Sequence, residues 1–143
     1  VFTNQHGLMG ISEKGKEAIK RLHDEGFRLE VASSSAGYYI GRVLDALEIR
    51  QYFECYTSGE EVEHPKPAPD TFLRAMEKLN LKPEDCIIVE DSTNGGKAAA
   101  AAGAKCVWFH NPDSGDQQIL HAVLTITSWS PENVDKLIDL MHA

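Results

Sequence analysis

Residues 87–96, IIVEDSTNGG, change abruptly from a wholly apolar run to two carboxylates, a hydroxyl and glycines. A continuous apolar run is typical of a strand that a parallel sheet buries on both faces. The residues Asn94, Gly95 and Gly96 then favour a tight turn into a helix. This stretch therefore predicts a strand, a turn and a helix of an α/β protein, with acidic side chains at the carboxyl end of the strand.

The segments on either side of this unit alternate between helical and strand patterns. Apolar spacing and start or stop residues predict helices over 12–25, 38–47, 70–79, 97–102 and 131–141. Short apolar runs predict strands over 27–32, 52–58, 86–90 and 105–109. Such alternation indicates a parallel sheet, and ligands of these sheets bind beyond the carboxyl ends of the strands. Chemistry is therefore expected at the residues that end each strand.

The composition is that of an ordinary soluble domain. With 143 residues, 42% hydrophobic and 25% charged, we expect a single domain over residues 1–143. The formal charge of −8 disfavours nucleic acid and acidic membranes as partners, because either would be repelled. The chain lacks an apolar run of roughly 20 residues and a signal-like start, which predicts a cytoplasmic protein. The sequence leaves the oligomeric state open.

Two loops carry residues that suit an anion. In VASSS, residues 31–35, Ser33 follows a strand and precedes a helix, where hydroxyls and unpaired amides favour negative charge. Ordinary capping of that helix is the alternative use of these serines. In HPKPAPD, residues 64–70, prolines flank Lys66, which can neutralise a phosphate as a compact cation. Here the alternative is a surface lysine in a proline-rich loop.

The adjacent carboxylates Glu90 and Asp91 favour a metal site. At the mouth of a sheet they would repel each other and resist burial unless a hard cation such as Mg²⁺ held them. The alternative is that Asp91 only caps the following helix. Together with the two anion loops, the pair predicts a site for Mg²⁺ and phosphate at the carboxyl ends of the strands.

The order of these motifs resembles the haloacid dehalogenase superfamily, and most closely its β-phosphoglucomutase-like branch. The resemblance rests on VASSS, SGEEV, KPAPDTF, VEDSTNG and AAAAAGAKCV and extends from about residue 12 to the C-terminus. It implies a Rossmann-like, doubly wound parallel sheet and a Mg²⁺ cofactor. It also implies phosphoryl transfer through an aspartyl-phosphate, with a small phosphorylated metabolite such as a sugar phosphate as substrate.

The resemblance assigns roles by position. Ser33 is implied to bind phosphate through its hydroxyl, with the backbone amide of Ser34 as a helper. Lys66 is implied to stabilise the phosphoryl group and to orient the nucleophile. Asp91 is implied to be a Mg²⁺ ligand and Glu90 a second or water-mediated one.

The catalytic carboxylates of the superfamily are missing from this sequence. Its members open with a strand that ends in Asp-x-Asp-Gly, whereas no Asp precedes Asp24 here. In one interpretation NQHG, residues 4–7, is the degenerate counterpart: Asn4 stands at the nucleophile, His6 at the acid/base, and Val1–Asn4 fills the central strand position. In the other, residues 1–10 are a linker remnant or foreign sequence. Either way the stretch before the first helix is too short for the usual helical cap.

Three hypotheses about the function of this chain follow from these observations. The first is a Mg²⁺-dependent hydrolase or phosphomutase, which this chain could perform only with a carboxylate nucleophile, because an amide cannot form an acyl-phosphate. The second is a pseudoenzyme that binds phosphate or a sugar phosphate without turnover. The third is a truncated core fragment in which the site residues have no present role.

Overall fold

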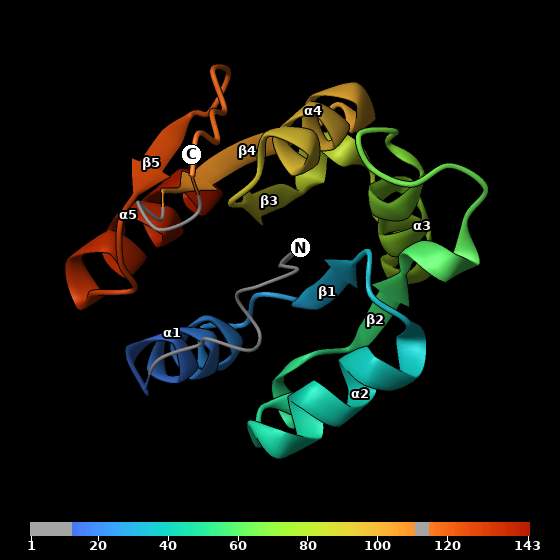
Figure 1. The fold of residues 1–143 in the computed structure, drawn as a ribbon. Coiled ribbons are helices and arrows are strands. Elements are labelled where there is room, and N and C mark those ends of the chain that lie inside the picture. Colours follow the sequence, from blue (N-terminus) through green and yellow to red (C-terminus); the bar gives the residue numbers. More distant parts are fainter. Residues whose placement is uncertain (1–12, 111–114) are drawn as a thin grey trace.

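The computed structural model describes residues 13–110 and 115–143, in which helices alternate with short strands (Figure 1). The α-helices are α1 (Glu13–Asp24), α2 (Gly37–Ala46), α3 (Asp70–Leu79), α4 (Thr93–Ala102) and α5 (Pro131–His142). The strands are β1 (Glu30–Ser33), β2 (Cys55–Ser58), β3 (Ile87–Glu90), β4 (Lys105–Phe109) and β5 (Leu124–Ile126). Short 3₁₀ turns are η1 (Arg50–Tyr52), η2 (Gly59–Glu61) and η3 (Pro83–Asp85).

Residues in the left-handed region follow the last turn of α1, α3 and α4. Gly26 has φ 92°, Asn80 has φ 55° and Gly103 has φ 83°. These are residue types that adopt this conformation at low cost, and it lets their N–H groups satisfy the last carbonyls of the helix. The N–H of Gly103, for example, bonds to the carbonyl of Ala100 at 3.1 Å. The helix ends expected at these residues are confirmed.

Each strand pair of the described residues is parallel, as the sequence predicts. β1 pairs with β2 from Glu30 beside Cys55 to Ser33 beside Ser58. β3 pairs with β4, and β4 pairs with β5. Within the described residues β1–β2 and β3–β4–β5 form two separate ladders, which are drawn apart from each other in Figure 1.

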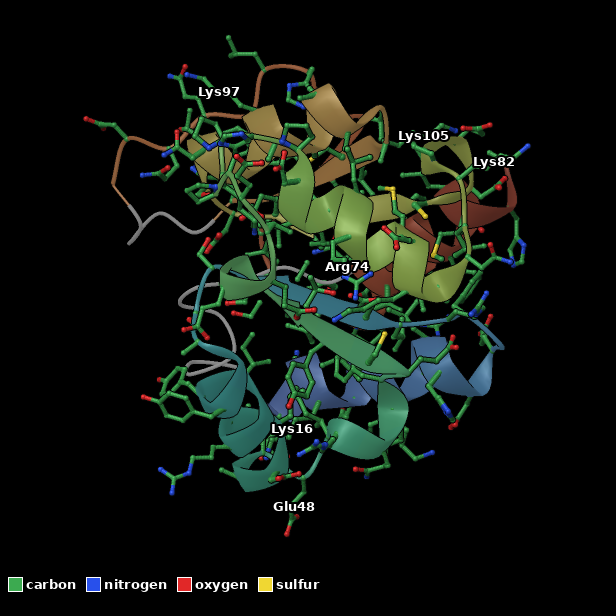
Figure 2. The ribbon with its side chains drawn as sticks, turned by 90° about the vertical axis from the view of Figure 1, so that its right-hand side faces the viewer. Lys16, Glu48, Arg74, Lys82, Lys97 and Lys105 are labelled. Carbon is green, nitrogen blue, oxygen red and sulfur yellow. The ribbon has the colours of Figure 1, made fainter. Side chains whose placement is uncertain are left out.

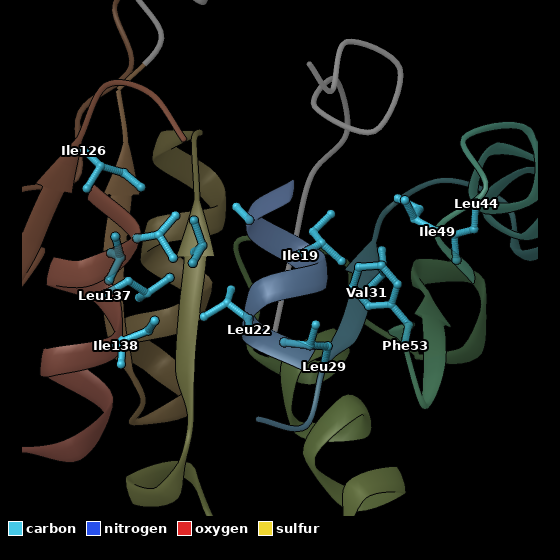
Figure 3. Close-up of a cluster of buried hydrophobic side chains, with 14 of the residues drawn as sticks. Ile19, Leu22, Leu29, Val31, Leu44, Ile49, Phe53, Ile126, Leu137 and Ile138 are labelled. Atoms are coloured by element: carbon cyan, nitrogen blue, oxygen red, sulfur yellow. The ribbon is translucent and has the colours of Figure 1, made fainter. Parts of the chain in front are cut away.

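Helices cover both faces of these strands, so the doubly wound arrangement is confirmed. Neighbouring strand residues, such as Ile88 and Val89, face opposite cores. The larger core joins α1, α2 and α5 to the strands; Figure 3 shows its side chains, among them Ile19, Leu44 and Leu137. The second core lies under α3 and α4 and consists largely of alanines around Phe72 and Met76.

Charged side chains surround this framework. Lys82, Lys97, Lys105 and Glu48 are exposed and extend from the periphery in Figure 2. Among the helices described, none has the length and apolar character that a membrane crossing requires. The described residues also form no separate helical cap.

Three of the strands differ clearly from the sequence prediction. β1 begins at Glu30 rather than at residue 27, and β2 begins at Cys55 because residues 50–52 form a 3₁₀ turn. The sequence did not predict β5, which has three residues and only one buried side chain, Ile126. A strand this short pairs only along β4 and shows little periodicity of its own.

Candidate functional site

The acidic end of β3 runs directly into α4. Glu90 is 2% exposed and Asp91 is 9% exposed. Ser92 is the N-cap of α4, and its hydroxyl accepts the N–H of Gly95 at 3.0 Å. The expected turn over Asn94, Gly95 and Gly96 is therefore wrong, because these residues form the first helical turn. Glycines suggested a break, but the serine cap and the packing of the helix start favour helix.

Gly95 leaves the space into which Glu90 folds. A Cβ atom at position 95 would lie 1.9 Å from Cδ of Glu90 and 2.3 Å from its Oε2. No carbon side chain can share that volume with the carboxylate. The glycine therefore positions Glu90 beneath the N-terminus of α4.

Lys66 joins the ends of β1 and β3. Its Nζ donates to Glu90 Oε2 at 3.2 Å and to the carbonyl of Ala32 at 3.3 Å. The ammonium also lies 4.6 Å from the ring centre of Phe72, the third residue of α3. The Lys66 side chain is 7% exposed, so the ion pair with Glu90 is largely removed from water. The structure thus brings three sequence-distant elements together at the predicted edge of the sheet.

Glu90 is held by donors on both carboxylate oxygens. Its Oε1 accepts the N–H of Asp91 at 3.1 Å and the hydroxyl of Ser92 at 3.3 Å, while Oε2 accepts Lys66. Hydrogen bonds of this kind stabilise the ionised carboxylate. Glu90 therefore has a positioning contact with Lys66 in addition to any role toward a metal.

The carboxylates fit part of a Mg²⁺ site. Mg²⁺ prefers hard oxygen ligands and is usually bound by one or two carboxylates together with phosphate oxygens and waters. Asp91 and Glu90 could supply those carboxylates. Within residues 13–110 and 115–143, no group of three His, Cys, Asp or Glu side chains is placed to hold a metal. A Mg²⁺ ion held by these two carboxylates would complete its coordination with other oxygens, such as those of water and phosphate.

The predicted anion loop follows β1. Ser33 ends the strand and is 1% exposed, and its hydroxyl accepts the N–H of Ser35 at 3.1 Å. This bond closes a local turn before α2. It does not cap the helix, because the N-cap of α2 is Ala36 and no side chain of these serines bonds to the first helical turn. Ser34 is half-buried and lies against the next loop, since a Cβ at Gly59 would be 3.3 Å from Ser34 Cα. Ser33 follows Ala32, whose carbonyl accepts Lys66, so the loop lies beside the lysine.

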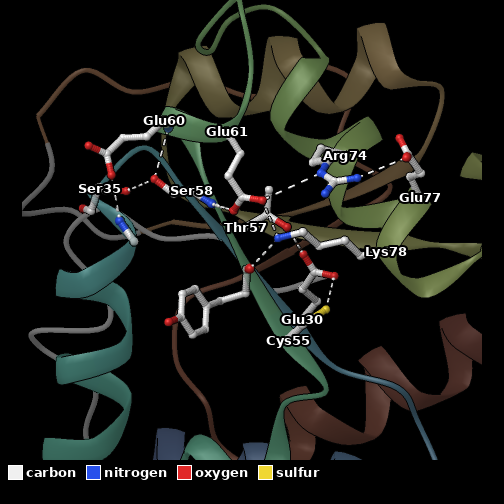
Figure 4. Close-up of polar contacts among 12 residues, drawn as sticks. Glu30, Ser35, Cys55, Thr57, Ser58, Glu60, Glu61, Arg74, Glu77 and Lys78 are labelled. Carbon is white, nitrogen blue, oxygen red and sulfur yellow. Dashed lines mark hydrogen bonds and ion pairs between the residues drawn. The ribbon is translucent and has the colours of Figure 1, made fainter.

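A second loop, Ser58–Glu61, holds the anion loop in place (Figure 4). The Ser58 hydroxyl donates to the carbonyl of Ser35 at 2.6 Å, and Glu60 Oε1 accepts the N–H of Gly37 at 3.0 Å. Ser58 and Glu61 form a reciprocal capping box around η2. The sequence signal was present, because Ser followed three residues later by Glu is the signature of that motif.

A buried carboxyl group, also missed in the sequence, lies behind this loop (Figure 4). Glu30 is 0% exposed and accepts hydrogen bonds from the Thr57 hydroxyl and, at 3.0 Å, from the Cys55 thiol. Burial raises the pKa of Glu30, although the bonds from Thr57 and Cys55 oppose the shift. Burial and the neighbouring Glu30 raise the pKa of Cys55 to about 12. Cys55, Cys86 and Cys106 are free thiols.

Residues 117–119, which follow β4 in the chain, contact the N-terminal turn of α4. The Gln117 side-chain oxygen accepts the N–H of Thr93 at 2.8 Å, and the Thr93 hydroxyl accepts the N–H of Gln118 at 2.9 Å. Ile119 packs against Gly96, where a Cβ would lie 2.8 Å from its Cγ1. No local motif marks Gln117, so sequence reasoning had no signal for it. Asn4 and His6, with all of residues 1–12, lie outside the described residues.

The family follows from comparison with known proteins. A family model for haloacid dehalogenase-like hydrolases matches residues 4–109. The chain belongs to this family. Among curated relatives, a haloacid dehalogenase-like hydrolase domain-containing protein of Arabidopsis thaliana is 33% identical over 138 residues, which cover 92% of this chain and 44% of that protein. A phosphorylated carbohydrates phosphatase of Thermotoga maritima is 30% identical over 119 residues, covering 83% of this chain and 55% of that protein.

Solved structures of haloacid dehalogenase-like proteins share the fold. An Asp-to-Asn variant of CbbY from Rhodobacter sphaeroides, in complex with xylulose-(1,5)bisphosphate, matches with a TM-score of 0.75 and 25% identity, over 87% of this chain and 59% of that one. A magnesium-bound hydrolase from Bacillus subtilis matches with a TM-score of 0.72, over 92% of this chain and 55% of that one; at 19% identity it supports the fold alone. The chain spans about half the length of the curated relatives it matches.

Proposed function

We propose that residues 1–143 form the core domain of a Mg²⁺-dependent phosphatase or phosphomutase that acts on a small phosphorylated carbohydrate. The contacts of Lys66 with Ala32 and Glu90 carry the proposal, because they hold a positive charge at the carboxyl ends of β1 and β3. The relatives that are phosphatases support the reaction class. The cytoplasmic location and the absence of nucleic-acid or membrane partners remain predictions from composition.

Lys66 would hold the transferring phosphoryl group. An ammonium has three N–H donors. Two of them are directed to Ala32 and Glu90, which leaves one for a phosphoryl oxygen. The Ser33 hydroxyl, which accepts from Ser35, still has its own proton to donate to the same group. Fixed donors of this kind stabilise charge that develops during transfer without having to reorganise.

Asp91 and Glu90 would hold the metal. Mg²⁺ bound there would polarise the phosphoryl oxygens and neutralise part of their charge. Glu90 would also keep the Lys66 ammonium in position through the 3.2 Å contact. Ser92 would support the pair, because its hydroxyl bonds to Glu90 and receives the N–H of Gly95.

A second candidate function is phosphate binding without turnover. The interpretation in which NQHG, residues 4–7, is the degenerate counterpart of Asp-x-Asp-Gly favours this function, because Asn4 and His6 would then replace the two catalytic carboxylates of the superfamily. An amide is a poor nucleophile toward phosphorus, and the aspartyl-phosphate cannot form on it. In that case Ser33, Ser34 and Lys66 would bind the phosphorylated ligand and release it unchanged.

One pair of assays separates the two functions. Hydrolysis of p-nitrophenyl phosphate with Mg²⁺ would be compared between the natural chain and Asn4→Asp/His6→Asp. Turnover by the double variant alone supports a phosphatase site that lacks its nucleophile. No turnover by either chain contradicts the catalytic proposal for this polypeptide.

Calorimetric titration with inorganic phosphate and Mg²⁺ tests the binding function. Lys66→Met is the test variant and Lys97→Met, an exposed lysine of α4, is the matched control. We expect binding to the natural chain and to Lys97→Met, but not to Lys66→Met. Binding that survives Lys66→Met would contradict both candidate functions.

A further inference from the structure

A cavity lies at the amino ends of β1 and β3, on the side of these strands opposite to the candidate site. It has a volume of about 260 Å³ and is lined by residues of α1, α3 and α5 as well as by the strands. Leu29 lines it just before β1, and Ile87 lines it as the first residue of β3. Lys66 contacts the same two strands at their carboxyl ends, through Ala32 and Glu90. We call this space the amino-end cavity.

Apolar side chains form most of the wall of the amino-end cavity. Leu22, Leu29 and Leu137 belong to the larger core and are labelled in Figure 3, while Phe27 and Met141 are half-buried. An apolar cavity of about 150 Å³ is large enough to bind benzene. The amino-end cavity is larger than that, so it has room for a compound with two fused rings.

Two polar side chains that line the amino-end cavity have no partner among the described residues. Asp85 is exposed, and its carboxylate forms neither an ion pair nor a hydrogen bond there. Cys86 is 6% exposed, and its thiol likewise forms no hydrogen bond. Arg28, the cation of the lining, is already engaged, because its Nε and Nη2 lie 2.6 Å and 3.0 Å from the carboxylate oxygens of Glu54. The cavity therefore suits a ligand that donates a hydrogen bond better than an anion, which Asp85 would repel.

We infer that the amino-end cavity is a binding site for a small neutral compound with fused rings and one N–H or O–H donor. The rings would remove the apolar walls from contact with water, which is favourable. The donor would bond to the carboxylate of Asp85 at the solvent-exposed side of the cavity. The inference goes beyond the proposed function, because none of the residues proposed to hold phosphate or Mg²⁺ lines this cavity. The two ligands should therefore not compete.

The first test compares two probes of the same shape, indole and benzofuran, by calorimetric titration; only indole has an N–H donor. We expect saturable binding of indole to the natural chain with a dissociation constant below about 1 mM. Indole should bind roughly fivefold more tightly than benzofuran, because only indole can donate to Asp85. Asp85→Ala should abolish this preference and change the affinity for benzofuran by less than about twofold. No saturable binding of indole to the natural chain, or an unchanged preference in Asp85→Ala, would overturn the inference.

A pair of leucine variants tests whether indole binds in the amino-end cavity. Leu81 is half-buried and lines the cavity, so Leu81→Phe should fill part of it and weaken indole binding by about tenfold. Leu73→Phe is the matched control, because Leu73 is 42% exposed on α3 and does not line the cavity. It should change the affinity by less than about twofold. Circular dichroism verifies that both variants are folded, and equal effects of the two substitutions on indole binding would contradict the location.

Cys86 provides a test of location that needs no variant. Saturating indole should slow the alkylation of Cys86 by iodoacetamide severalfold, measured by peptide mass spectrometry, because the ligand covers the thiol. Cys106 is 1% exposed and does not line the cavity, so its labelling rate should not change. Equal slowing of both thiols, or no slowing of Cys86, would overturn the inference.

A competition experiment separates this inference from the proposed function. Phosphate and Mg²⁺ should leave the affinity for indole within about twofold, because the two sites share no residue. Displacement of indole by phosphate would place indole in the candidate site and overturn the inference. If indole binds as expected but phosphate does not bind at all, the proposed function fails and the inference stands.

Discussion

Lys66 Nζ lies 3.2 Å from Glu90 Oε2, and the two side chains are 7% and 3% exposed. The pair connects the loop before α3 to the end of β3, while the second bond of Lys66 reaches the carbonyl of Ala32 in β1. Burial of two charges costs desolvation energy that their attraction offsets only while both are present. The contact therefore serves both the site and the stability of the fold.

Removing one member of this pair should destabilise the protein. We expect Lys66→Met to lower the free energy of unfolding by roughly 3 kcal/mol, because Glu90 is left as a buried charge without its cation. Lys66→Met/Glu90→Gln should recover part of the loss. Urea denaturation followed by circular dichroism measures these differences. The control is Lys97→Met, on the exposed face of α4, which should change the free energy of unfolding by less than about 0.5 kcal/mol. If Lys66→Met and Lys97→Met lowered the free energy of unfolding equally, the stabilising role of the Lys66–Glu90 pair would be contradicted.

Gly95→Ala tests whether the glycine makes room for Glu90. The added methyl group collides with the Glu90 carboxylate, at 1.9 Å from its Cδ, so the carboxylate must leave Lys66. We expect a loss of about 2 kcal/mol in the free energy of unfolding, together with loss of phosphate binding. In a Glu90→Ala background the colliding atoms are gone, and the same substitution should be neutral or stabilising by up to ~1 kcal/mol through helix propensity. An equal cost in both backgrounds, measured by urea denaturation, would refute the explanation.

The sequence predicts the elements whose signals are local. The apolar run before Glu90 and the period of α3 depend on neighbouring residues, and both elements were found where they were expected. The sequence also predicts that Lys66 and Glu90 lie at one edge of the sheet, because parallel strands place their carboxyl ends together, and the structure brings these two side chains into contact. Their direct ion pair, however, joins residues 24 positions apart and has no local signature.

The features that sequence reasoning missed depend on distant partners or on competing local rules. Glu30 looks like an exposed residue of an alternating strand, and its burial follows from Thr57 and Cys55 on the neighbouring strand. Gly95 was assigned to a turn on intrinsic propensity, whereas the space required by Glu90 determines its role within α4. In both cases tertiary packing outweighs the intrinsic preference of the residue.

The buried Glu30 should make stability depend on pH. Burial raises its pKa in the folded protein above the ordinary value of 4.5. The folded state then holds a proton that the unfolded state releases, so stability from this group is present below pH 4.5 and is lost as pH rises through the folded pKa. In Glu30→Gln the side chain at this position does not titrate. The free energy of unfolding of Glu30→Gln, compared with that of the natural chain, should therefore increase between pH 4 and pH 8. Urea denaturation at each pH measures this difference. Glu17→Gln, at an exposed position of α1, supplies the baseline; parallel pH curves for the natural chain and Glu30→Gln would show that the raised pKa is wrong.

The same carboxylate should suppress the reactivity of Cys55. Burial and then the hydrogen bond to Glu30 raise the pKa of Cys55 to about 12, so the reactive thiolate form is scarce at pH 8. Cys106, with a pKa of about 12 from burial, is the internal control because its thiol does not contact Glu30. We expect slow labelling of both thiols by iodoacetamide in the folded protein, and faster labelling of Cys55 alone in Glu30→Gln, resolved by peptide mass spectrometry. Faster labelling of Cys106 as well would indicate general opening of the fold, and unchanged labelling of Cys55 would show that Glu30 does not control its protonation.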